Sequence, residues 1–234
     1  MKYSIKVNSI NSKEGSNIKG FATVVFGDSF KITNIAILEN KDKEQFFISM
    51  PRYKSNERDD NGGTIYKDVC NPITAEFREE LYTNILEAYE RAIVPEQEKK
   101  QKRDKVNKGS YEMPEFSVTV SPYEKEGSNI KGLARIYFEN SFIVNNVNIL
   151  QGKENIFVSM PSYKTKQIDE QGKAIYHDVC YPVTKEFREK LYGEIVREYE
   201  QAKDKNQNQV RENDEKHEGD SEKQQEKKAT PFRK

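Results

Sequence analysis

The sequence has few of the residue types that carry nucleophilic catalysis, metal binding or covalent cross-links. It contains only two histidines and two cysteines among 234 residues. Two cysteines at equivalent positions of two similar stretches fit a reducing compartment better than a disulfide framework. A Gly-rich phosphate loop, an HExxH motif and a nucleophile elbow are also absent. We therefore predict no enzymatic activity, no catalytic residue, no metal, no cofactor and no small-molecule substrate.

Long apolar runs are missing as well. No stretch approaches the ~20 apolar residues that a helix needs to cross a bilayer. The first ten residues lack the long apolar core and cleavage site of a secretory signal. We expect a cytoplasmic protein with no membrane partner.

Excess charge of either sign is the third absence. The 39 Lys and Arg side chains are balanced by 39 Asp and Glu side chains. Residues 1–94 carry 13 basic and 14 acidic groups, and residues 115–202 carry 11 and 13. Because neither half is basic, binding to nucleic acid would depend on a local patch of cations and not on a bulk positive field.

One stretch of the sequence occurs twice. Residues 49–90 and 159–200 align without a gap, and 23 of the 42 positions are identical. The shared residues include Met-Pro, Tyr-Lys, Ile-Tyr-x-Asp-Val-Cys-x-Pro and Thr-x-Glu-Phe-Arg-Glu. Such a duplication predicts two homologous units, and a function that rests on a unit present twice.

Alternating apolar residues open both copies and predict a half-buried strand in each. The same seven residues, Glu-Gly-Ser-Asn-Ile-Lys-Gly, follow both strands at 14–20 and 126–132. A repeated loop could bind a ligand, but Gly, Ser and Asn favour the tight turn of a β-hairpin. The alternating residues are Tyr3, Ile5 and Val7 in the first copy and Phe116, Val118 and Val120 in the second.

Further strands and a polar loop follow in each copy. In the third strand, the apolar positions change parity between Ile32 and Ile35, and between Val144 and Val147 in the second copy. This change predicts a β-bulge, because an extra residue lets a strand keep its apolar side inward. The other strands are expected at 21–26, 46–50, 133–138 and 156–160, and the polar loops lie around 62–63 and 172.

An amphipathic helix ends each copy. Thr74 and Thr184 are candidate N-caps, and each is followed by an acidic residue in the first turn. Apolar side chains then recur every four residues, as expected of one buried stripe. The stripe consists of Phe77, Leu81, Ile85 and Tyr89 in the first copy and Phe187, Leu191, Ile195 and Tyr199 in the second.

These elements predict an α+β fold of two tandem repeats, each with a small antiparallel β-sheet and a C-terminal α-helix. The units span 1–94 and 114–202, and a charged linker at 95–113 joins them. Residues 203–234 contain almost no apolar side chains and are predicted to be a disordered charged tail. Exposed sheet edges favour intramolecular pairing of the two repeats as a pseudo-dimer.

Two sets of titratable residues have both a chemical and a structural interpretation. The spacing of His177 and Cys180 could supply two metal ligands, but the first copy has a lysine in place of the histidine. Cys70 and Cys180 are expected to be small buried groups. Asp68 and Asp178 could do acid–base work, although an Asp in an extended segment before a helix more often accepts hydrogen bonds.

The remaining group of polar candidate residues is cationic. An Arg in the first turn of an exposed helix suits phosphate, because its planar fork and the helix amides both attract anionic oxygens. The alternative is that these cations pair with Glu76, Glu79 and their equivalents on a solvated face. The candidates for nucleic-acid binding are Arg52, Lys54 and Arg78 in the first copy and Lys164, Arg188 and Lys190 in the second, with Tyr53 and Tyr163 among them.

The order of these motifs resembles the SpoVG family, the stage V sporulation or septation regulators of bacteria. The resemblance rests on strand-turn-strand, then Phe-x-Ser-Met-Pro, a basic residue three beyond that proline, and an Asp with a Pro four later. An Arg-bearing helix that ends in Tyr-Glu completes it. It covers about residues 1–92 and 114–202, so the family unit is present as a tandem duplication.

The resemblance implies a small, usually dimeric protein that binds DNA and RNA. This chain departs from the family pattern at the Gly after the helix Arg, which is a glutamate in both copies. An extra carboxylate at this place would weaken phosphate binding. The family's helix Arg falls on Arg78 and Arg188, its neighbouring Lys on Lys190 but on Glu80 in the first copy, and its basic residue after Met-Pro on Lys54 and Lys164.

Two functions of different classes are consistent with these residues. The first is a nucleic-acid-binding regulator, with DNA or RNA as partner and a place in septation and sporulation that the resemblance implies. The second is a non-catalytic scaffold in which the fold is kept, the nucleic-acid site is degenerate and the tail recruits protein partners. Binding to mixed DNA and RNA across a salt series separates the two.

Overall fold

Each repeat forms an antiparallel β-sheet with a helix at its end, which confirms the predicted α+β organisation. The computed structural model describes residues 1–10, 15–93, 112–123 and 126–226, so most of the predicted linker lies outside the described residues. In this part of the chain, no helix is long and apolar enough to span a bilayer.

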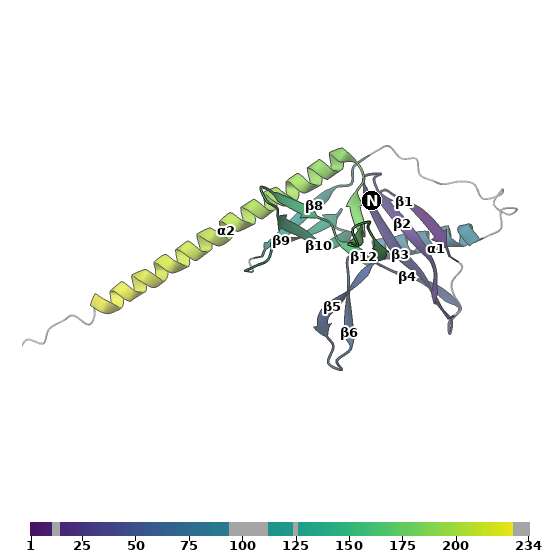
Figure 1. The fold of residues 1–234 in the computed structure, drawn as a ribbon, viewed down its shortest axis with the longest axis horizontal. Coiled ribbons are helices and arrows are strands. Elements are labelled where there is room, and N and C mark those ends of the chain that lie inside the picture. The colour runs from purple at the N-terminus through teal and green to yellow at the C-terminus, as the bar shows by residue number, and fades with distance from the viewer. Residues whose placement is uncertain (11–14, 94–111, 124–125, 227–234) are drawn as a thin grey trace, which may run out of the picture.

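Figure 1 shows the two repeats in chain order. The first contains β1 (Tyr3–Ser9), β2 (Ile18–Phe26), β3 (Phe30–Asn40), β4 (Gln45–Ser49), β5 (Arg52–Arg58), β6 (Thr64–Asp68), β7 (Cys70–Pro72) and α1 (Ala75–Ile93). The second contains β8 (Phe116–Pro122), β9 (Ile130–Phe138), β10 (Phe142–Gln151), β11 (Ile156–Ser159), β12 (Ser162–Ile168), β13 (Ala174–Asp178), β14 (Cys180–Pro182) and α2 (Lys185–Glu226).

The first four strands of each repeat pair with their neighbours in the chain. β1 to β4 and β8 to β11 are antiparallel meanders. In the turns before β2 and β9, Gly15 has a φ of 89° and Gly127 a φ of 74°, angles that favour glycine. A serine hydroxyl, of Ser16 or Ser128, accepts a hydrogen bond from the amide two residues on. The predicted hairpins are confirmed.

The predicted β-bulge bends β3 and β10. The pairing of β3 with β2 shifts between Ile32 and Ile35, where Asn34 has a φ of 60°. β10 has the same irregularity, with Asn146 at a φ of 56°. Ile32 and Ile35, on either side of the bulge, are both fully buried, because the extra residue restores the inward side of the strand.

The two sheets exchange one short strand. β14 of the second repeat pairs with β3 of the first, and β7 of the first repeat pairs with β10 of the second. The bulges also form hydrogen bonds across the exchange. The Thr33 amide donates to the Val179 carbonyl at 2.8 Å, and the Asn145 amide donates to the Val69 carbonyl at 2.8 Å. Each sheet therefore contains a strand from the other half of the chain.

One hydrophobic core spans both repeats. The ring of Phe26 lies 5.5 Å from that of Phe138 and 5.0 Å from that of Phe142, measured between centroids. Phe30 lies 4.8 Å from Phe138, and Phe77 of α1 lies 6.4 Å from Phe142. Because these large rings come from both halves, the halves share the burial that stabilises them.

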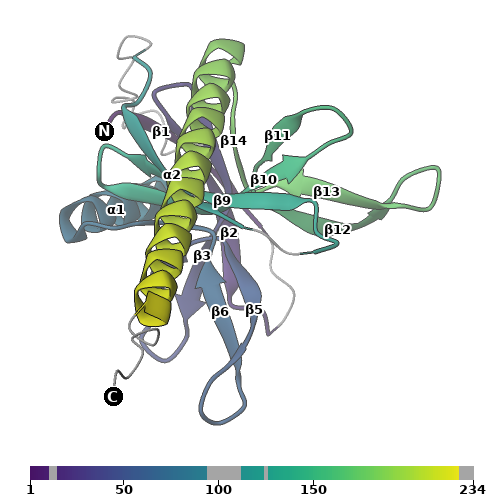
Figure 2. The same cartoon turned by 90° about the vertical axis from the view of Figure 1, so that its left-hand side faces the viewer.

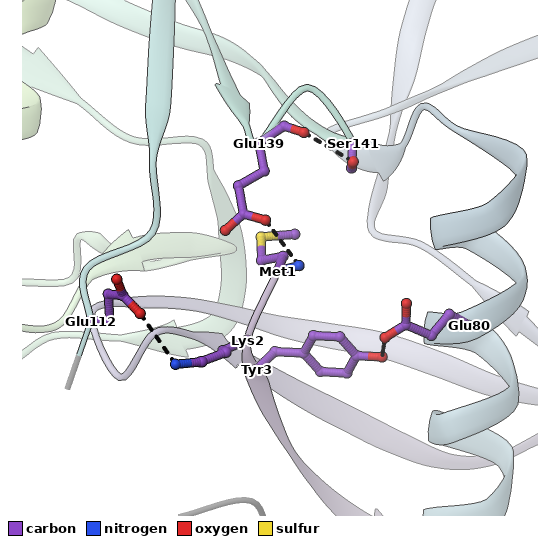
Figure 3. A network of polar contacts seen from close by, with 7 residues as sticks. All are labelled: Met1, Lys2, Tyr3, Glu80, Glu112, Glu139 and Ser141. Carbon is purple, nitrogen blue, oxygen red and sulfur yellow. Dashed lines mark hydrogen bonds and ion pairs between the residues drawn. The ribbon is translucent and has the colours of Figure 1, made fainter. Parts of the chain in front are cut away.

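The start of the chain adds polar contacts between the repeats (Figure 3). The amino group of Met1 lies 2.9 Å from a carboxylate oxygen of Glu139, and Lys2 Nζ lies 3.2 Å from Glu112. The Lys2 pair is well exposed, and such a pair contributes about 0–1 kcal/mol. These contacts tie β1 to the second repeat, but the shared aromatic core dominates.

A two-stranded arm projects from each repeat. Among the described strands, β5 pairs only with β6, and β12 only with β13. Figure 2 shows both arms extending away from the sheets, and Figure 1 shows the β5–β6 arm from another side. Asp59 and Asp169 close the arm tips by accepting hydrogen bonds from amides of the turn, where Gly62 and Gly172 both have a φ of 76°.

The predicted polar loops are present as turns around Gly62 and Gly172, but the residues between the fourth strand and these turns are not part of a loop. These residues form β5 and β12, the first strand of each arm. Their side chains are almost all exposed, so the sequence shows no alternation of apolar and polar residues. Because both faces of these strands are exposed, the sequence lacks the alternation by which strands are usually recognised.

The two helices begin and pack as predicted. The Thr74 hydroxyl accepts a hydrogen bond from the Phe77 amide at 3.3 Å, and Thr184 accepts one from Phe187 at 3.3 Å. Both threonines are therefore N-caps. The predicted stripe is buried in each helix, where α1 packs on β1 and β4 and α2 packs on β8 and β11.

The end of α2 differs from the prediction of a disordered tail. The helix continues to Glu226, although the composition predicts disorder from residue 203. Residues 203–226 are rich in Lys, Glu and Gln, which have high helix propensity. The packed turns before them supply the nucleus that helix propagation needs. In Figure 1 this segment extends beyond the sheets, and residues 227–234 lie outside the described residues.

Candidate nucleic-acid interface

An exposed arginine lies in the first turn of each helix. Arg78 Nη2 donates a hydrogen bond to the Pro72 carbonyl at 3.0 Å, and Arg188 Nη2 donates one to the Pro182 carbonyl at 3.3 Å. These carbonyls end β7 and β14, so the exchanged strands position both guanidinium groups. A guanidinium has five N–H donors, so this contact leaves donors for a phosphate.

The second arginine stands near the base of its arm. Burial raises the pKa of Asp178, the last residue of β13, and the nearby Arg188 guanidinium and His177 offset part of that rise. Burial likewise raises the pKa of Tyr192, and Arg188 opposes this change as well. The charge of Arg188 therefore acts on both Asp178 and Tyr192, although among the described residues no ion pair or hydrogen bond joins it to either.

The alternative pairing of these arginines with helix glutamates is not seen. Among the described residues, no ion pair joins Arg78 or Arg188 to Glu76, Glu79 or their equivalents. Glu189 lies instead 3.7 Å from Lys185. Glu189 is therefore next to Arg188 in the sequence without engaging its guanidinium.

The cations of the first arm are largely engaged by neighbouring groups. Lys67 Nζ forms an ion pair with Glu57 at 2.5 Å, and Arg58 donates to the Thr64 hydroxyl at 2.7 Å. Arg52 donates to the Ser49 hydroxyl, and its charge opposes the rise that burial causes in the pKa of Asp68. Of the predicted residues of this arm, Lys54 is exposed opposite Tyr66.

The second arm carries the same stem with fewer carboxylates. Gln167 and His177 stand where the first arm has Glu57 and Lys67. The predicted residue Lys164 is exposed opposite Tyr176, and Lys166 is exposed two residues further on. Within the described ranges, neither lysine takes part in an ion pair. The second arm is therefore the more available surface for an anion.

The structure does not bring Lys190 together with Arg188. Lys190 Nζ lies over the ring of Phe116 in β8, 5.6 Å from its centroid. Two residues along a helix point to different sides, and a cation over an aromatic ring is a favourable contact. In the first repeat Glu80 occupies this position and accepts a hydrogen bond from the Tyr3 hydroxyl at 2.8 Å (Figure 3).

Replacing Tyr3 by phenylalanine, the residue found at the equivalent position 116, tests this contact. The Tyr3 hydroxyl donates to Glu80 and accepts from Asn84 at 2.7 Å, and burial together with Glu80 raises its pKa. We expect Tyr3→Phe to lower the free energy of unfolding by about 1 kcal/mol, measured by urea denaturation. Tyr123→Phe, at a tyrosine 38% exposed, is the control and should change nothing measurable. Equal stability of both variants would contradict the assignment.

The two cysteines meet where the strands are exchanged. Cys70 and Cys180 are free and fully buried, as predicted for small buried groups. Burial raises the pKa of the Cys180 thiol, and a hydrogen bond with Cys70 adds to this rise. No pattern in the sequence predicts this contact, which joins residues 110 positions apart. In the part of the chain that the structure describes, no three His, Cys, Asp or Glu side chains are grouped as metal ligands.

Exposed tyrosines are the functional candidates that the sequence analysis missed. Tyr66 is 57% exposed in the first arm, and Tyr176 is 60% exposed in the second. Both belong to the Ile-Tyr-x-Asp motif that the two copies share. The sequence shows that this motif is repeated but not that it lies on a free arm.

Comparison with known proteins agrees with the duplicated fold. The SpoVG family model matches residues 1–91 and 113–201. A "Putative septation protein SpoVG" of Caldanaerobacter subterraneus subsp. tengcongensis is 32% identical over 91 residues, which are 39% of this chain and 92% of that protein. A protein of the same name from Clostridium beijerinckii is 31% identical over 85 residues, 36% of this chain and 86% of that protein. No solved structure is significantly similar to the chain.

Proposed function

Because the chain belongs to the SpoVG family along both of its repeats, we propose that it is a DNA- or RNA-binding regulator. The relatives are named for septation, and a role in septation and sporulation is part of the proposal. The chain carries two family units joined in one core, so a single molecule presents two related surfaces to a nucleic acid.

The observation that carries the proposal is the exposed arginine in the first turn of each helix, held by a carbonyl of an exchanged strand. Arg188 is held in place by the Pro182 carbonyl, so little side-chain entropy is lost when it binds a phosphate. The first-turn amides of α2 add partial positive charge at the same place. Lys164 on the neighbouring arm supplies a second cation.

The second repeat is the stronger of the two surfaces. Three of the four arm cations of the first repeat, all except Lys54, are paired with Glu57 or with hydroxyl groups, and a phosphate would have to displace these partners. In the second repeat, Lys164 and Lys166 have no such partner among the described residues. Arg78, Lys54 and Arg52 are therefore assigned a secondary role, and Lys190 a peripheral one.

Replacing Arg188 by alanine tests the proposal. We expect Arg188→Ala to raise the Kd for DNA or RNA about tenfold at ~0.1 M salt, because a charge-assisted hydrogen bond contributes at least ~1.5 kcal/mol. Losing one phosphate contact should also reduce the slope of log Kd against log salt by about 1. Fluorescence anisotropy with mixed-sequence DNA and RNA, in a salt series, measures both.

Arg197→Ala is the matched control. Arg197 is an exposed arginine of the same helix, and it is paired with Glu194 and Glu198. Its loss should leave the Kd within about twofold, since its charge is already compensated. Equal effects of the two variants would place the site elsewhere. If the full chain binds neither DNA nor RNA at low salt, the regulator proposal fails.

A scaffold function is the second candidate, and an apolar groove favours it. The groove lies between β11 and α2 and is lined by Phe157, Val158, Tyr192 and Val196. Phe157 is 48% exposed there, and with its apolar neighbours it forms a continuous exposed patch, the kind of surface that binds proteins. Absence of nucleic-acid binding at low salt would favour this function.

A further inference from the structure

The β12–β13 arm carries a tyrosine and a basic residue on each of its faces. Residues directly opposite in an antiparallel pair lie on the same face. Lys164 is opposite Tyr176, and Tyr163 is opposite His177. Tyr176 is 60% exposed and Tyr163 is 40% exposed. The Tyr163 and His177 rings meet edge to face with their centroids 6.0 Å apart.

We propose that this arm binds single-stranded nucleic acid, with unpaired bases stacked on Tyr176 and Tyr163. Lys164 and Arg188 then lie beside the phosphates of the same strand. The inference rests on the proposed function and adds the class of nucleic acid and the residues that contact bases. Tyr163 lies among the cations that the sequence singles out, whereas Tyr176 is identified only by its exposure on the arm.

The exposure of the two rings favours an unpaired base as their ligand. A tyrosine ring on a free arm presents a face that solvent covers, and a base can replace that solvent by stacking. The bases of a duplex already stack on each other, so their faces are not available to a side chain. A base stacked on tyrosine strengthens binding roughly 5- to 150-fold.

The charge of the arm also favours a single strand. Residues 162–178 contain three lysines and three carboxylates, so the arm is neutral. A duplex presents one charge for about every 1.7 Å of its axis and is bound mainly through released counterions. A neutral arm gains little from that release. Its carboxylates at the tip, Asp169 and Glu170, would repel a second phosphate backbone.

The first arm offers a natural comparison. Tyr66 is opposite Lys54, as Tyr176 is opposite Lys164, and it is exposed to nearly the same extent. Glu57, which pairs with Lys67 on this arm, places a carboxylate on its stem where the second arm has Gln167. Tyr66 should therefore contribute less to binding than Tyr176.

The test measures the full chain against three labelled probes by fluorescence anisotropy. The probes are a mixed-sequence RNA and a DNA single strand, each of about 20 nucleotides to exceed one binding site, and the DNA annealed to its complement. We expect the single strands to bind at least about tenfold more tightly than the duplex. Tyr176→Ala should weaken single-strand binding at least about fivefold, and Tyr176→Phe, which keeps the ring, less than about twofold. Tyr66→Ala should have the smaller effect of the two alanine variants.

The possible results distinguish failure of the single-strand inference from failure of the proposed function on which it rests. Duplex binding as tight as single-strand binding and weakened by Arg188→Ala overturns the inference and leaves the proposed function standing. A Tyr176→Ala variant that binds single strands like the unaltered chain overturns it as well. No binding of any probe overturns both. Because Tyr176 is exposed, its variants should unfold at an unchanged temperature, and Tyr176→Phe separates loss of the ring from loss of folding.

Discussion

Replacing Phe26 by alanine is expected to lower the free energy of unfolding by about 3–5 kcal/mol, because it empties the centre of the shared core. Phe26 is fully buried and lies within 5.5 Å of two rings of the second repeat, Phe138 and Phe142, between centroids. The centroid of its ring also lies 6.3 Å from that of Phe77, in helix α1 of the same repeat. A cavity at this place removes contacts from both repeats at once.

Urea denaturation followed by circular dichroism measures this loss. We expect one cooperative transition in the unaltered chain and in Phe26→Ala, because the core does not divide between the repeats. Phe157→Ala removes a ring that is 48% exposed and should cost no more than about 0.5 kcal/mol. Two separate transitions, with only the first affected by Phe26→Ala, would show that the repeats unfold independently.

Residues 1–93, expressed without the second repeat, are expected to form a homodimer and no stable monomer. In the full chain β3 pairs with β14, which the fragment lacks. The fragment contains Cys-Asn-Pro in β7, closely similar to Cys-Tyr-Pro in β14. A second fragment can therefore offer β7 to the β3 edge and supply the missing half of the aromatic core.

Size-exclusion chromatography with light scattering gives the mass of this fragment. We expect twice the mass of one fragment polypeptide, and an unfolding midpoint that rises with protein concentration. The full chain is the control, and its midpoint should not depend on concentration, since both partners are covalently joined. A folded, monomeric fragment would contradict the role assigned to the exchanged strands.

The periodic elements of the fold could be predicted from the sequence. Apolar residues at a spacing of four gave α1 and the first turns of α2 with their caps, and the change of parity near Ile32 and Val144 gave the bulges. These signals are local, because burial on one side leaves a regular pattern. The arms could not be found in this way, since both of their faces are exposed.

The exchanged strands were beyond sequence reasoning for a different reason. β7 and β14 are three residues long, and each pairs with a strand of the other half. A segment of this length has no measurable period, and its partner is fixed only by the tertiary fold. The contact of Cys70 with Cys180 depends on the same exchange and was missed for the same cause.

The role of the candidate site residues stays a prediction, and the structure bears only on their placement. Arg78 and Arg188 were selected because helix N-termini and arginine forks both attract phosphate, and the structure leaves both exposed. Lys190 was grouped with Arg188 by proximity in sequence, whereas the helix turns it toward Phe116. Tyr66 and Tyr176 were missed because a tyrosine in an extended segment is usually part of a core, and only the arm shows otherwise.

The exchange of β7 and β14 also determines when each half of the protein can finish folding during its synthesis. A ribosome delivers the N-terminal half first, yet the first sheet gains its β14 strand only after residues 180–182 have left the exit tunnel. Until then the first half exposes the β3 edge and the apolar faces of Phe26 and Phe30. Completion of either half therefore waits until nearly the whole polypeptide has been synthesised.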